Sequence, residues 1–375
     1  MKRVVMLTPN FYPHIGGAEK QALELSKALK ARGAQVVVLT RRRKGLAEQE
    51  TVSGIPVKRL AAFGEGGSLL DSVLFLLSSF AFLWANADKY DAVHVHLAGS
   101  PALAAALVGR LLGKRVVVKI GGGRGIGEIA ASSRTVPGRL KLRLLKRLGP
   151  QFVCVARDLL EELREGIGAD GMHIPNGVDL AAYRPASPDE KAALRRGLCG
   201  PGPLFLYVGR IAAEKRLDGF LRSFAAALEE AKTEARFVMA GSGPQEGLLR
   251  AEISRLGLEG RAKLLAPCHD VARLYGAADV FVLPSVSEGL SNALLEGMAA
   301  GLAVLASRVG GTREAVEEGK TGLLFDPNDP AQERRQIVRL LSEPGLAAGL
   351  GRAARAEAEA RYSIESVASR YIELY

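Results

Sequence analysis

The chain alternates short apolar runs with longer amphipathic segments along its whole length. The short runs are rich in Val, Leu and Ala and have the composition of buried strands, whereas the longer segments repeat apolar residues with helical spacing. Buried strands separated by helices are typical of parallel sheets in a doubly wound α/β arrangement. The predicted strands cover 4–7, 36–39, 92–95, 115–120 and 152–155, and then 205–208, 236–240, 262–265, 280–283, 303–306 and 322–324.

The predicted helices fall between these strands and also form two series. They cover 17–32, 70–87, 101–112 and 138–148, and then 215–232, 245–257, 270–276, 291–300, 312–318 and 330–343. A chain of 375 residues is long enough for two such domains. Turn residues collect at 174–185, where we expect the hinge. We therefore predict an N-terminal domain at 1–178 and a C-terminal domain at 179–359, facing each other across a cleft.

Composition describes a chain that can bury large cores, with 48% hydrophobic and 24% charged residues. The three cysteines, Cys154, Cys199 and Cys268, show no CxxC pairing, which favours a reducing compartment over a disulfide framework or zinc site. The start of the chain leads directly into a predicted strand rather than a signal peptide, so we expect a cytoplasmic protein. The most hydrophobic segment, 69–87, is interrupted by Asp71 and by serines, and we interpret it as a largely buried helix, with membrane contact as the alternative.

The net charge of +11 is unevenly placed. One cluster is Arg41–Lys44, and a second, without any acid, lies within the predicted helix 138–148. Its members are Arg139, Lys141, Arg143, Lys146 and Arg147. A basic amphipathic helix can rest on an anionic lipid surface at the inner face of the cell membrane, or it can be a solvated face, and both interpretations remain open. Nucleic acid is not expected as a partner, because aromatic residues are only 6% and no binding motif is present.

Two carboxylates, Glu288 and Glu296, flank the start of the predicted helix 291–300. Ser291 or Asn292 can cap this helix, so free N–H groups would face the carboxyl end of the sheet, where α/β domains bind phosphorylated ligands. Carboxylates repel phosphate, and we therefore expect both to accept hydrogen bonds from ribose or sugar hydroxyls. The alternative is that they are two solvated glutamates.

Cations and glycines also follow predicted strands. Gly16 and Gly17 precede the first helix, where a backbone N–H can approach an anion. Arg210 and Lys215 follow the strand 205–208 and suit a diphosphate leaving group, because they can offset its developing charge. Glycine-lined turns recur at Gly241-Ser-Gly243-Pro244 and at Gly310-Gly311-Thr312. A surface Arg and Lys without any ligand is the alternative.

The motifs occur in a family-specific order: Asn176-Gly-Val-Asp179, Val208-Gly-Arg-Ile211 with Glu214-Lys215, Gly241-Ser-Gly-Pro244, Glu288-x7-Glu296, Gly310-Gly311-Thr312-Arg-Glu314 and Gly319-Lys-Thr-Gly-Leu-Leu324. In this the chain resembles the retaining glycosyltransferases of family 4 (group 1), which have the GT-B fold of two Rossmann-like domains. The resemblance covers nearly the whole chain and is strongest over 174–326. It implies an N-terminal acceptor-binding domain, on which the C-terminal helix, 360–375, packs back, and a C-terminal nucleotide-sugar-binding domain.

The resemblance also implies roles for individual residues. Arg210 and Lys215 would bind the donor diphosphate and assist its departure, Glu296 would bind the ribose, and Glu288 would bind the transferred sugar. The remaining donor-binding residues implied are Gly17, Gly243, Ser291, Asn292, Ala293 and Leu294. His96 matches the position of a histidine beside the donor sugar, with a structural histidine as the alternative, and His94 is expected on the opposite face of its strand.

A front-face mechanism with retention is implied, in which the departing phosphate takes the acceptor's proton, so we assign no general base. We expect no metal and no cofactor, a UDP- or GDP-sugar donor, and a glycan or lipid-linked acceptor in cell-envelope polysaccharide biosynthesis. We expect the base of the nucleotide near Pro267-Cys268-His269. The alternatives are a non-catalytic nucleotide-sugar binding protein, or an epimerase or glycan phosphorylase of the same fold.

One segment departs from the family pattern. Many relatives carry a His-Gly pair after the strand 115–120, whereas this chain has Gly121-Gly-Gly-Arg124-Gly-Ile-Gly127 followed by Glu128. Five glycines in seven residues predict a mobile loop over the cleft, with Arg124 touching an anionic acceptor or the donor phosphate.

Overall fold

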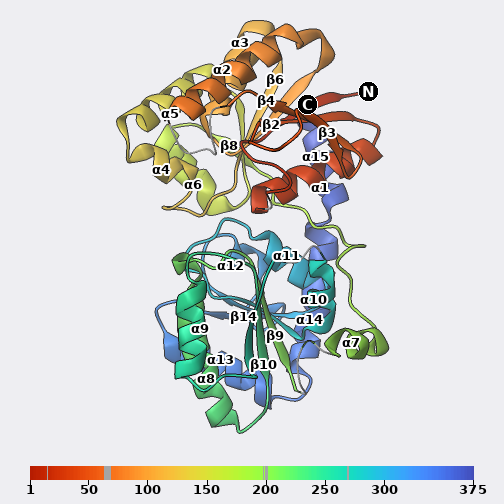
Figure 1. Cartoon of the computed structure of the whole chain (residues 1–375), viewed down its shortest axis with the longest axis vertical. Coiled ribbons are helices and arrows are strands. Elements are labelled where there is room, and N and C mark those ends of the chain that lie inside the picture. The colour runs from red at the N-terminus through yellow and green to blue at the C-terminus, as the bar shows by residue number, and fades with distance from the viewer. Residues whose placement is uncertain (15, 63–68, 197, 199–201, 268–269) are drawn as a thin grey trace. The chain divides into compact units, whose positions relative to one another are not determined.

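The chain folds into two compact units, drawn in Figure 1. The structure is a computed structural model that describes residues 1–14, 16–62, 69–196, 198, 202–267 and 270–375. Unit 1 comprises Met1–Gly177 together with Ile364–Tyr375, and unit 2 comprises Val178–Ser363. The predicted division after residue 178 differs from this boundary by one residue, and the returning segment starts at 364 instead of 360.

Unit 1 is an eight-stranded sheet covered by helices, with strand order β3-β4-β2-β1-β5-β6-β7-β8. All pairs are parallel except β3 and β4, which are antiparallel. In chain order the elements are β1 (Arg3–Leu7), α1 (Gly17–Ala31), β2 (Gln35–Arg41), β3 (Gln49–Val52), β4 (Ile55–Leu60), α2 (Leu69–Ala85), a 3₁₀ turn (Ala87–Lys89), β5 (Ala92–His96), α3 (Ser100–Leu112), β6 (Arg115–Ile120), α4 (Glu128–Ser133), α5 (Val136–Leu148), β7 (Gln151–Cys154), α6 (Arg157–Ile167), β8 (Gly171–His173) and α15 (Ile364–Leu374).

Unit 2 is a six-stranded parallel sheet with strand order β11-β10-β9-β12-β13-β14. Its elements are α7 (Pro188–Arg195), β9 (Leu204–Val208), a 3₁₀ turn (Ala213–Lys215), α8 (Leu217–Ala231), β10 (Arg236–Ala240), α9 (Glu246–Arg255), β11 (Ala262–Leu265), α10 (Val271–Ala277), β12 (Val280–Leu283), α11 (Asn292–Ala299), β13 (Ala303–Ser307), α12 (Thr312–Ala315), β14 (Gly322–Phe325), α13 (Pro330–Ser342) and α14 (Leu346–Arg361).

The two-domain α/β prediction is confirmed, and every predicted strand is present to within a few residues. The strands β3, β4 and β8 and the helices α4, α6, α7 and α14 were not predicted. The β3–β4 hairpin lacks an apolar run on its first strand, since β3 reads Gln-Glu-Thr-Val and is largely exposed. Its signal lies in the turn instead, where Ser53 and Gly54 both have positive φ, at 49° and 79°.

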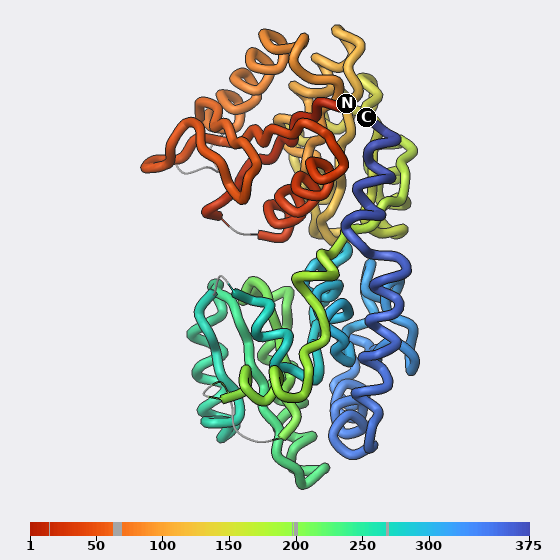
Figure 2. The backbone as a smooth tube through the Cα atoms, turned by 90° about the vertical axis from the view of Figure 1, so that its right-hand side faces the viewer, coloured from red at the N-terminus to blue at the C-terminus, as the bar shows by residue number. Residues whose placement is uncertain are grey.

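The C-terminal helix α15 completes the core of unit 1. In Figure 2 it is the blue segment that runs beside the strands of unit 1 and ends near the N-terminus. Its Tyr371 and Tyr375 are buried in the same core as residues of α1 and of the central strands. Lys2 donates from its Nζ to the backbone oxygen of Tyr375. Unit 1 therefore depends on a segment that is distant in sequence.

Helix α2 differs from the expectation of a largely buried helix. Phe75 and Leu83 are fully buried, but Leu70, Leu77 and Trp84 expose 64%, 55% and 47% of their surface. The prediction was wrong for this outer side, because apolar composition alone does not distinguish a covered helix from one with an exposed apolar face. None of the helices in the described part of the chain is both long and apolar enough to span a bilayer.

Candidate active site

The strand order of unit 2 identifies where a ligand would bind. From β9 to β11 the chain adds strands toward one edge of the sheet, and from β12 to β14 it adds them toward the other. This chain reversal lies between β9 and β12, which are hydrogen-bonded parallel neighbours although three strands apart in sequence order. In doubly wound sheets, ligands bind outside the carboxyl ends of the strands at this reversal. Arg210 and Lys215 follow β9, and Glu288 follows β12. The cations and the carboxylate therefore come from the two strands that define the expected position.

Lys215 and Glu288 are in direct contact. The Nζ of Lys215 donates to Oε1 of Glu288 at 2.5 Å, and the side chains are 18% and 11% exposed. The hydroxyl of Ser285 donates to the same oxygen at 2.6 Å. Glu288 is thus not a solvated glutamate, since its carboxylate is held by a cation and a hydroxyl. The sequence did not predict the role of Ser285, which precedes Glu288 by three residues in an irregular loop.

Arg210 has a different environment. Its guanidinium forms an ion pair with Glu214 and is 65% exposed, while its backbone oxygen accepts a hydrogen bond from Tyr207 at 2.8 Å. Tyr207 is fully buried, so it anchors the backbone at this point. The side chain of Arg210 can therefore leave Glu214 and turn toward an anion, while the backbone after β9 stays in place.

Glu296 lies inside the helix whose start Ser291 caps. The Ser291 hydroxyl accepts from the N–H of Leu294, so the prediction of Ser291 as a possible N-cap is confirmed. Glu296 is only 4% exposed. Burial and, second, the Glu296 carboxylate raise the pKa of Tyr275, whose hydroxyl donates to the backbone oxygen of Ala293 at 3.2 Å. Tyr275 thus ties the Asn292–Ala293 turn to the region of Glu296, a contact that the sequence did not predict.

The predicted glycines bring backbone segments together around these residues. A Cβ on Gly310, whose φ is +43°, would lie 1.8 Å from the backbone oxygen of Glu288, and Gly311 donates to the oxygen of Gly289 at 2.9 Å. A Cβ on Gly243 would lie 2.1 Å from the oxygen of Ile211. The glycine turns therefore pack against the very loops that carry Glu288 and Arg210, where any side chain would displace the backbone.

Unit 1 has its own chain reversal, between β1 and β5. Gly17 opens the helix that follows β1, with Gly16 as the N-cap residue, and His96 ends β5. Both therefore lie on the carboxyl side of this reversal, as expected. His96 is 2% exposed, and within the described residues its Nε2 has no hydrogen-bond partner.

The expectation for His94 was wrong. Residues two apart on a strand point to the same face, and the rings of His94 and His96 stack with centroids 4.7 Å apart. Nδ1 of His94 is hydrogen-bonded to the hydroxyl of Tyr375 at 2.5 Å. Burial is the main cause that lowers the pKa of both histidines, followed by the proximity of His96 and Lys119 to His94 and of Lys119 to His96. Both rings are therefore neutral at physiological pH.

A buried lysine on β6 was not predicted. Lys119 pairs with His96 in the β5–β6 register, is 4% exposed, and lies with its Nζ 5.8 Å from the ring centre of Tyr371. Burial lowers its pKa to about 7. A cation inside the apolar run Val116–Ile120 is the sequence signal that could have indicated it.

The glycine-rich loop 121–127 is held by four carboxylates. Glu128 accepts from the N–H groups of Gly121 and Gly122 at 3.0 and 3.1 Å, and Glu162 accepts from that of Gly125 at 3.1 Å. Arg124 pairs with Glu161 and with Glu165 on α6 at 2.6 and 3.0 Å. The expectation of a mobile loop with Arg124 turned to a ligand does not fit these contacts, because helix α6 holds both the backbone and the guanidinium.

Two further points complete the site. Three of the residues named above lie outside the described part of the chain: Cys199, and also Cys268 and His269, near which we expected the nucleotide base.

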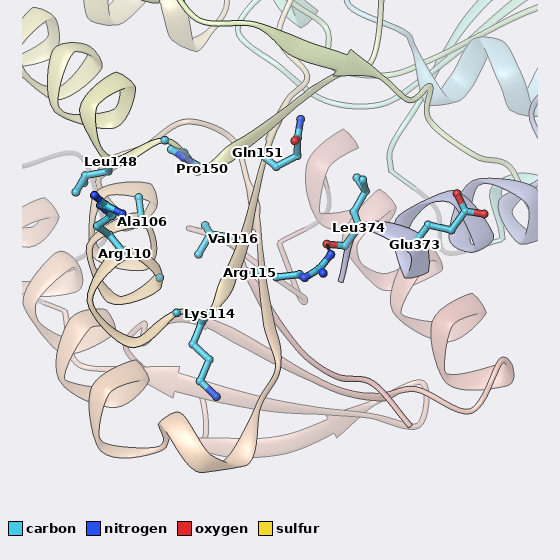
Figure 3. A pocket seen from close by; sticks show the side chains of 13 residues that line it. Ala106, Arg110, Lys114, Arg115, Val116, Leu148, Pro150, Gln151, Glu373 and Leu374 are labelled. Carbon is cyan, nitrogen blue, oxygen red and sulfur yellow. Dashed lines mark hydrogen bonds between the residues drawn. The ribbon is translucent and has the colours of Figure 1, made fainter.

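A cavity of about 550 Å³ is present in unit 1, where Arg110, Lys114 and Arg115 line it (Figure 3). It lies at the amino ends of β6 and β7, at the opposite sheet edge from His96, and so is distinct from the candidate site.

Comparisons with known proteins agree with this arrangement. The family of glycosyl transferases group 1 matches residues 202–343, and Glycosyltransferase Family 4 matches residues 15–182. The chain is 31% identical to the D-inositol 3-phosphate glycosyltransferase of Nocardiopsis dassonvillei, over 90% of this chain and 84% of that protein. It is 25% identical to the N-acetyl-alpha-D-glucosaminyl L-malate synthase of Bacillus anthracis, over 97% and 94%. Among solved structures, Anabaena Alr3699/HepE in complex with UDP superimposes with a TM-score of 0.78 at 20% identity, covering 100% of this chain and 99% of that one.

Proposed function

Because the chain belongs to the group 1, family 4 glycosyltransferases and shares their GT-B fold, we propose that it transfers a sugar from a UDP- or GDP-sugar to an acceptor with retention of anomeric configuration. One observation carries this proposal for the chain itself. Lys215, Glu288 and the Ser291-capped helix that contains Glu296 converge at the chain reversal of unit 2. Binding of UDP by the Anabaena structure supports a nucleotide donor.

In this proposal the residues of unit 2 hold the donor. The N–H groups from Ser291 to Leu294, at the positive end of α11, bind the distal phosphate, and Gly243 allows the backbone to approach the nucleotide. Arg210 and Lys215 stabilise the charge that develops on the leaving diphosphate. Glu296 accepts from the ribose hydroxyls and Glu288 from a sugar hydroxyl.

Glu288 has a second consequence for the chemistry. Its pairing with Lys215 fixes the ammonium group before any donor arrives, and Ser285 fixes Glu288 in turn. A preorganised cation costs no reorganisation when the glycosyl–phosphate bond breaks. From unit 1, we propose that Gly17 contributes an N–H to the phosphate and His96 a neutral ring to the sugar. The leaving phosphate takes the acceptor's proton, so the reaction needs neither a metal nor a protein base.

The acceptor in this proposal carries negative charge and is a glycan or a lipid-linked molecule. The relatives are named for an inositol phosphate and for malate, both anions. In this chain Arg42, Arg43 and Lys44 follow β2 directly, at the carboxyl edge of the sheet of unit 1, and Arg43 is oriented by Asn10 at 2.7 Å. We include in the proposal a role in cell-envelope polysaccharide biosynthesis at the inner face of the cell membrane, with the cations of α5 as support.

The test is turnover of a panel of UDP-, GDP- and ADP-sugars with and without EDTA, alongside thermal shifts with the free nucleotides. We expect one nucleotide to stabilise the protein, unaffected by EDTA, and a product with retained configuration by NMR. Stabilisation without turnover on any acceptor would leave only a binding protein, and an epimerised donor formed without acceptor would indicate an epimerase. A chain that no nucleotide stabilises would overturn the proposal.

A further inference from the structure

Exposed apolar side chains gather on three helices of unit 1. Of the fourteen large hydrophobic side chains that are exposed in the described part of the chain, nine lie on α2, α3 and α5. They are Leu70, Val73, Leu77, Trp84, Leu107, Leu111, Val136, Leu140 and Leu144. The helices pack side by side, α2 against α3 and α3 against α5, as the upper part of Figure 1 shows. We call this surface the α2–α3–α5 face. Contiguous exposed apolar surface of this kind marks an interaction site.

The periodicity of α2 explains its contribution. The exposed positions 70, 73, 77, 81, 84 and 85 are all apolar, and their spacing of three or four residues places them in one stripe along the helix. The single charged residue of α2, Asp71, lies on the other side, fully buried and paired with Arg41 at 3.1 Å. Helix α2 therefore turns its charge inward and an apolar stripe outward, the reverse of a solvated surface helix.

Cations border this stripe. Helix α3 adds Arg110 beside Leu111, and α5 carries Arg139, Arg143, Lys146 and Arg147 around Leu140 and Leu144. Within these three helices, the only carboxylate is the buried one of Asp71. Exposed carboxylates lie outside the three helices, at Asp88 in the turn after α2 and at Glu161 and Glu165 on α6, which pair with Arg124. The three helices therefore present apolar and cationic side chains, and no exposed acid lies on them.

An anionic bilayer surface fits this combination better than a second copy of the chain. Apolar side chains enter the region between headgroups and acyl chains, and Arg and Lys bind the headgroups. In a symmetric dimer the same face would meet itself, and its cations would oppose cations without exposed acids to pair with. Trp84, partly exposed and stacked on Phe80, suits the bilayer interface, where aromatic rings are enriched.

We propose that the α2–α3–α5 face lies on an anionic lipid bilayer and that the acceptor is a lipid-linked molecule presented from it. This inference rests on the proposed function for the acceptor, and it assigns the bilayer contact to α2 and α3 as well as to the basic helix α5. Helices α2 and α3 follow β4 and β5, so their amino ends lie at the carboxyl edge where the acceptor loops of unit 1 begin. Helix α5 follows β6 through the short helix α4 and leads into β7, so its carboxyl end lies toward the amino edge of the sheet. A headgroup leaving the bilayer at this edge reaches those loops directly.

The test is co-flotation of the full chain with vesicles of phosphatidylcholine, with or without phosphatidylglycerol. We expect binding to the mixed vesicles only. In Leu77→Glu and in Leu140→Glu the affinity for these vesicles should fall roughly tenfold or more, because each substitution removes apolar area that the bilayer would bury and adds repulsion from the anionic headgroups. Leu248→Glu, on α9 of unit 2, is the matched control, since Leu248 is 49% exposed, similar to Leu77 at 55%. It should bind as the unchanged chain does.

Three results would overturn the inference: no flotation of the folded unchanged chain, flotation that Leu77→Glu leaves intact, or self-association that Leu77→Glu abolishes in a chain that does not bind vesicles. The last would assign the face to a second copy. Nucleotide binding is measured on the same samples by thermal shift. Loss of nucleotide binding with retained flotation would refute the proposed function and leave the bilayer contact standing.

Discussion

Lys215 and Glu288 form an ion pair in which Nζ and Oε1 are 2.5 Å apart. A cation proposed to bind the diphosphate and a carboxylate proposed to bind the sugar are therefore direct neighbours. Each fixes the position of the other, and both are largely buried. Removing either charge consequently has two effects, the loss of one contact to the donor and the release of its partner.

We expect substitutions of the two residues to change the affinity for the nucleotide in opposite directions. In Lys215→Met we expect UDP, or whichever nucleotide is preferred, to bind roughly 10–100-fold more weakly, because a charge-assisted contact to phosphate is lost. In Glu288→Gln we expect the nucleotide to bind at least as tightly, since Lys215 is no longer neutralised, while kcat falls about 10²–10³-fold. Isothermal titration and steady-state kinetics separate the two.

Lys320→Met is the control for these variants, because Lys320 is exposed and pairs only with Glu317 in the described structure. It should leave both parameters unchanged. Equal weakening of nucleotide binding in Lys215→Met and Glu288→Gln would show that the pair acts as a structural unit and does not divide its roles between phosphate and sugar.

Glu296 should determine preference for the ribose. If its carboxylate accepts from the ribose hydroxyls, the unchanged enzyme binds a nucleoside diphosphate about tenfold more tightly than the 2′,3′-dideoxy form. Glu296→Ala should bind both alike. Tyr275→Phe is the neighbouring control, since it removes the bond to Ala293 but leaves the carboxylate. A dideoxy preference that survives Glu296→Ala would be evidence against the ribose assignment.

Gly310 and Gly319 provide a matched pair of substitutions. Both have positive φ, at 43° and 74°, so alanine costs each about 1–2 kcal/mol of strain. At Gly310 the new Cβ would lie against the backbone of Glu288. At Gly319, no heavy atom of the described residues other than its chain neighbours lies within 4 Å of the new Cβ. We expect Gly310→Ala to lower kcat/KM roughly 10²-fold by displacing Glu288, and Gly319→Ala to change stability alone. Similar kcat/KM values for both would contradict the role of Gly310 as a support for that loop.

At neutral and acidic pH, Lys119 should lower the free energy of unfolding of unit 1. Its folded pKa of about 7 lies under the ordinary value of 10.5, so between these two the unfolded chain binds a proton that the folded chain does not. Stability therefore rises with pH through this window. The groups that face Lys119 are His94 and His96 on β5 and Tyr371 on α15, and none of them is acidic at these pH values.

Lys119→Met should abolish this rise and stabilise the protein by up to a few kcal/mol at pH 7 and below. Urea titrations over a pH series measure it, with Lys89→Met on the surface as control. His94 and His96, whose folded pKa values are lowered, should still give a separate rise in stability with pH that is complete near the ordinary value of 6.5. An unchanged alkaline rise in Lys119→Met would contradict the assignment.

Periodicity predicted the elements that build the two sheets, because the strands are apolar on both faces. It missed β3, which is polar and exposed, and α7, whose described residues are not buried. The positions of Arg210, Lys215 and Glu288 also followed from the sequence, since each lies in the segment that follows a buried strand. Their roles remain predictions until the variants are measured.

The contacts made by these residues could not be predicted in the same way. Ser285 reaches Glu288, and Glu214 reaches Arg210, through irregular loops whose course depends on tertiary packing. Arg124 likewise lies among five glycines, which suggest a flexible backbone, yet carboxylates thirty-seven and forty-one residues away hold it. His94 was a different case, because strand periodicity correctly applied places it on the face of His96.

Helix α15 also determines the order in which the two units can be completed. Unit 2 is one continuous segment, Val178–Ser363, whereas the core of unit 1 lacks Tyr371 and Tyr375 until residues 364–375 are made. During synthesis, which proceeds from the N-terminus, the second half can close its core while the first is still open along the groove that α15 fills. Unit 1 is therefore translated first but completed after unit 2, and a nascent chain leaves β5 and β6, which carry His94 and Lys119, uncovered by α15 until residues 364–375 are made.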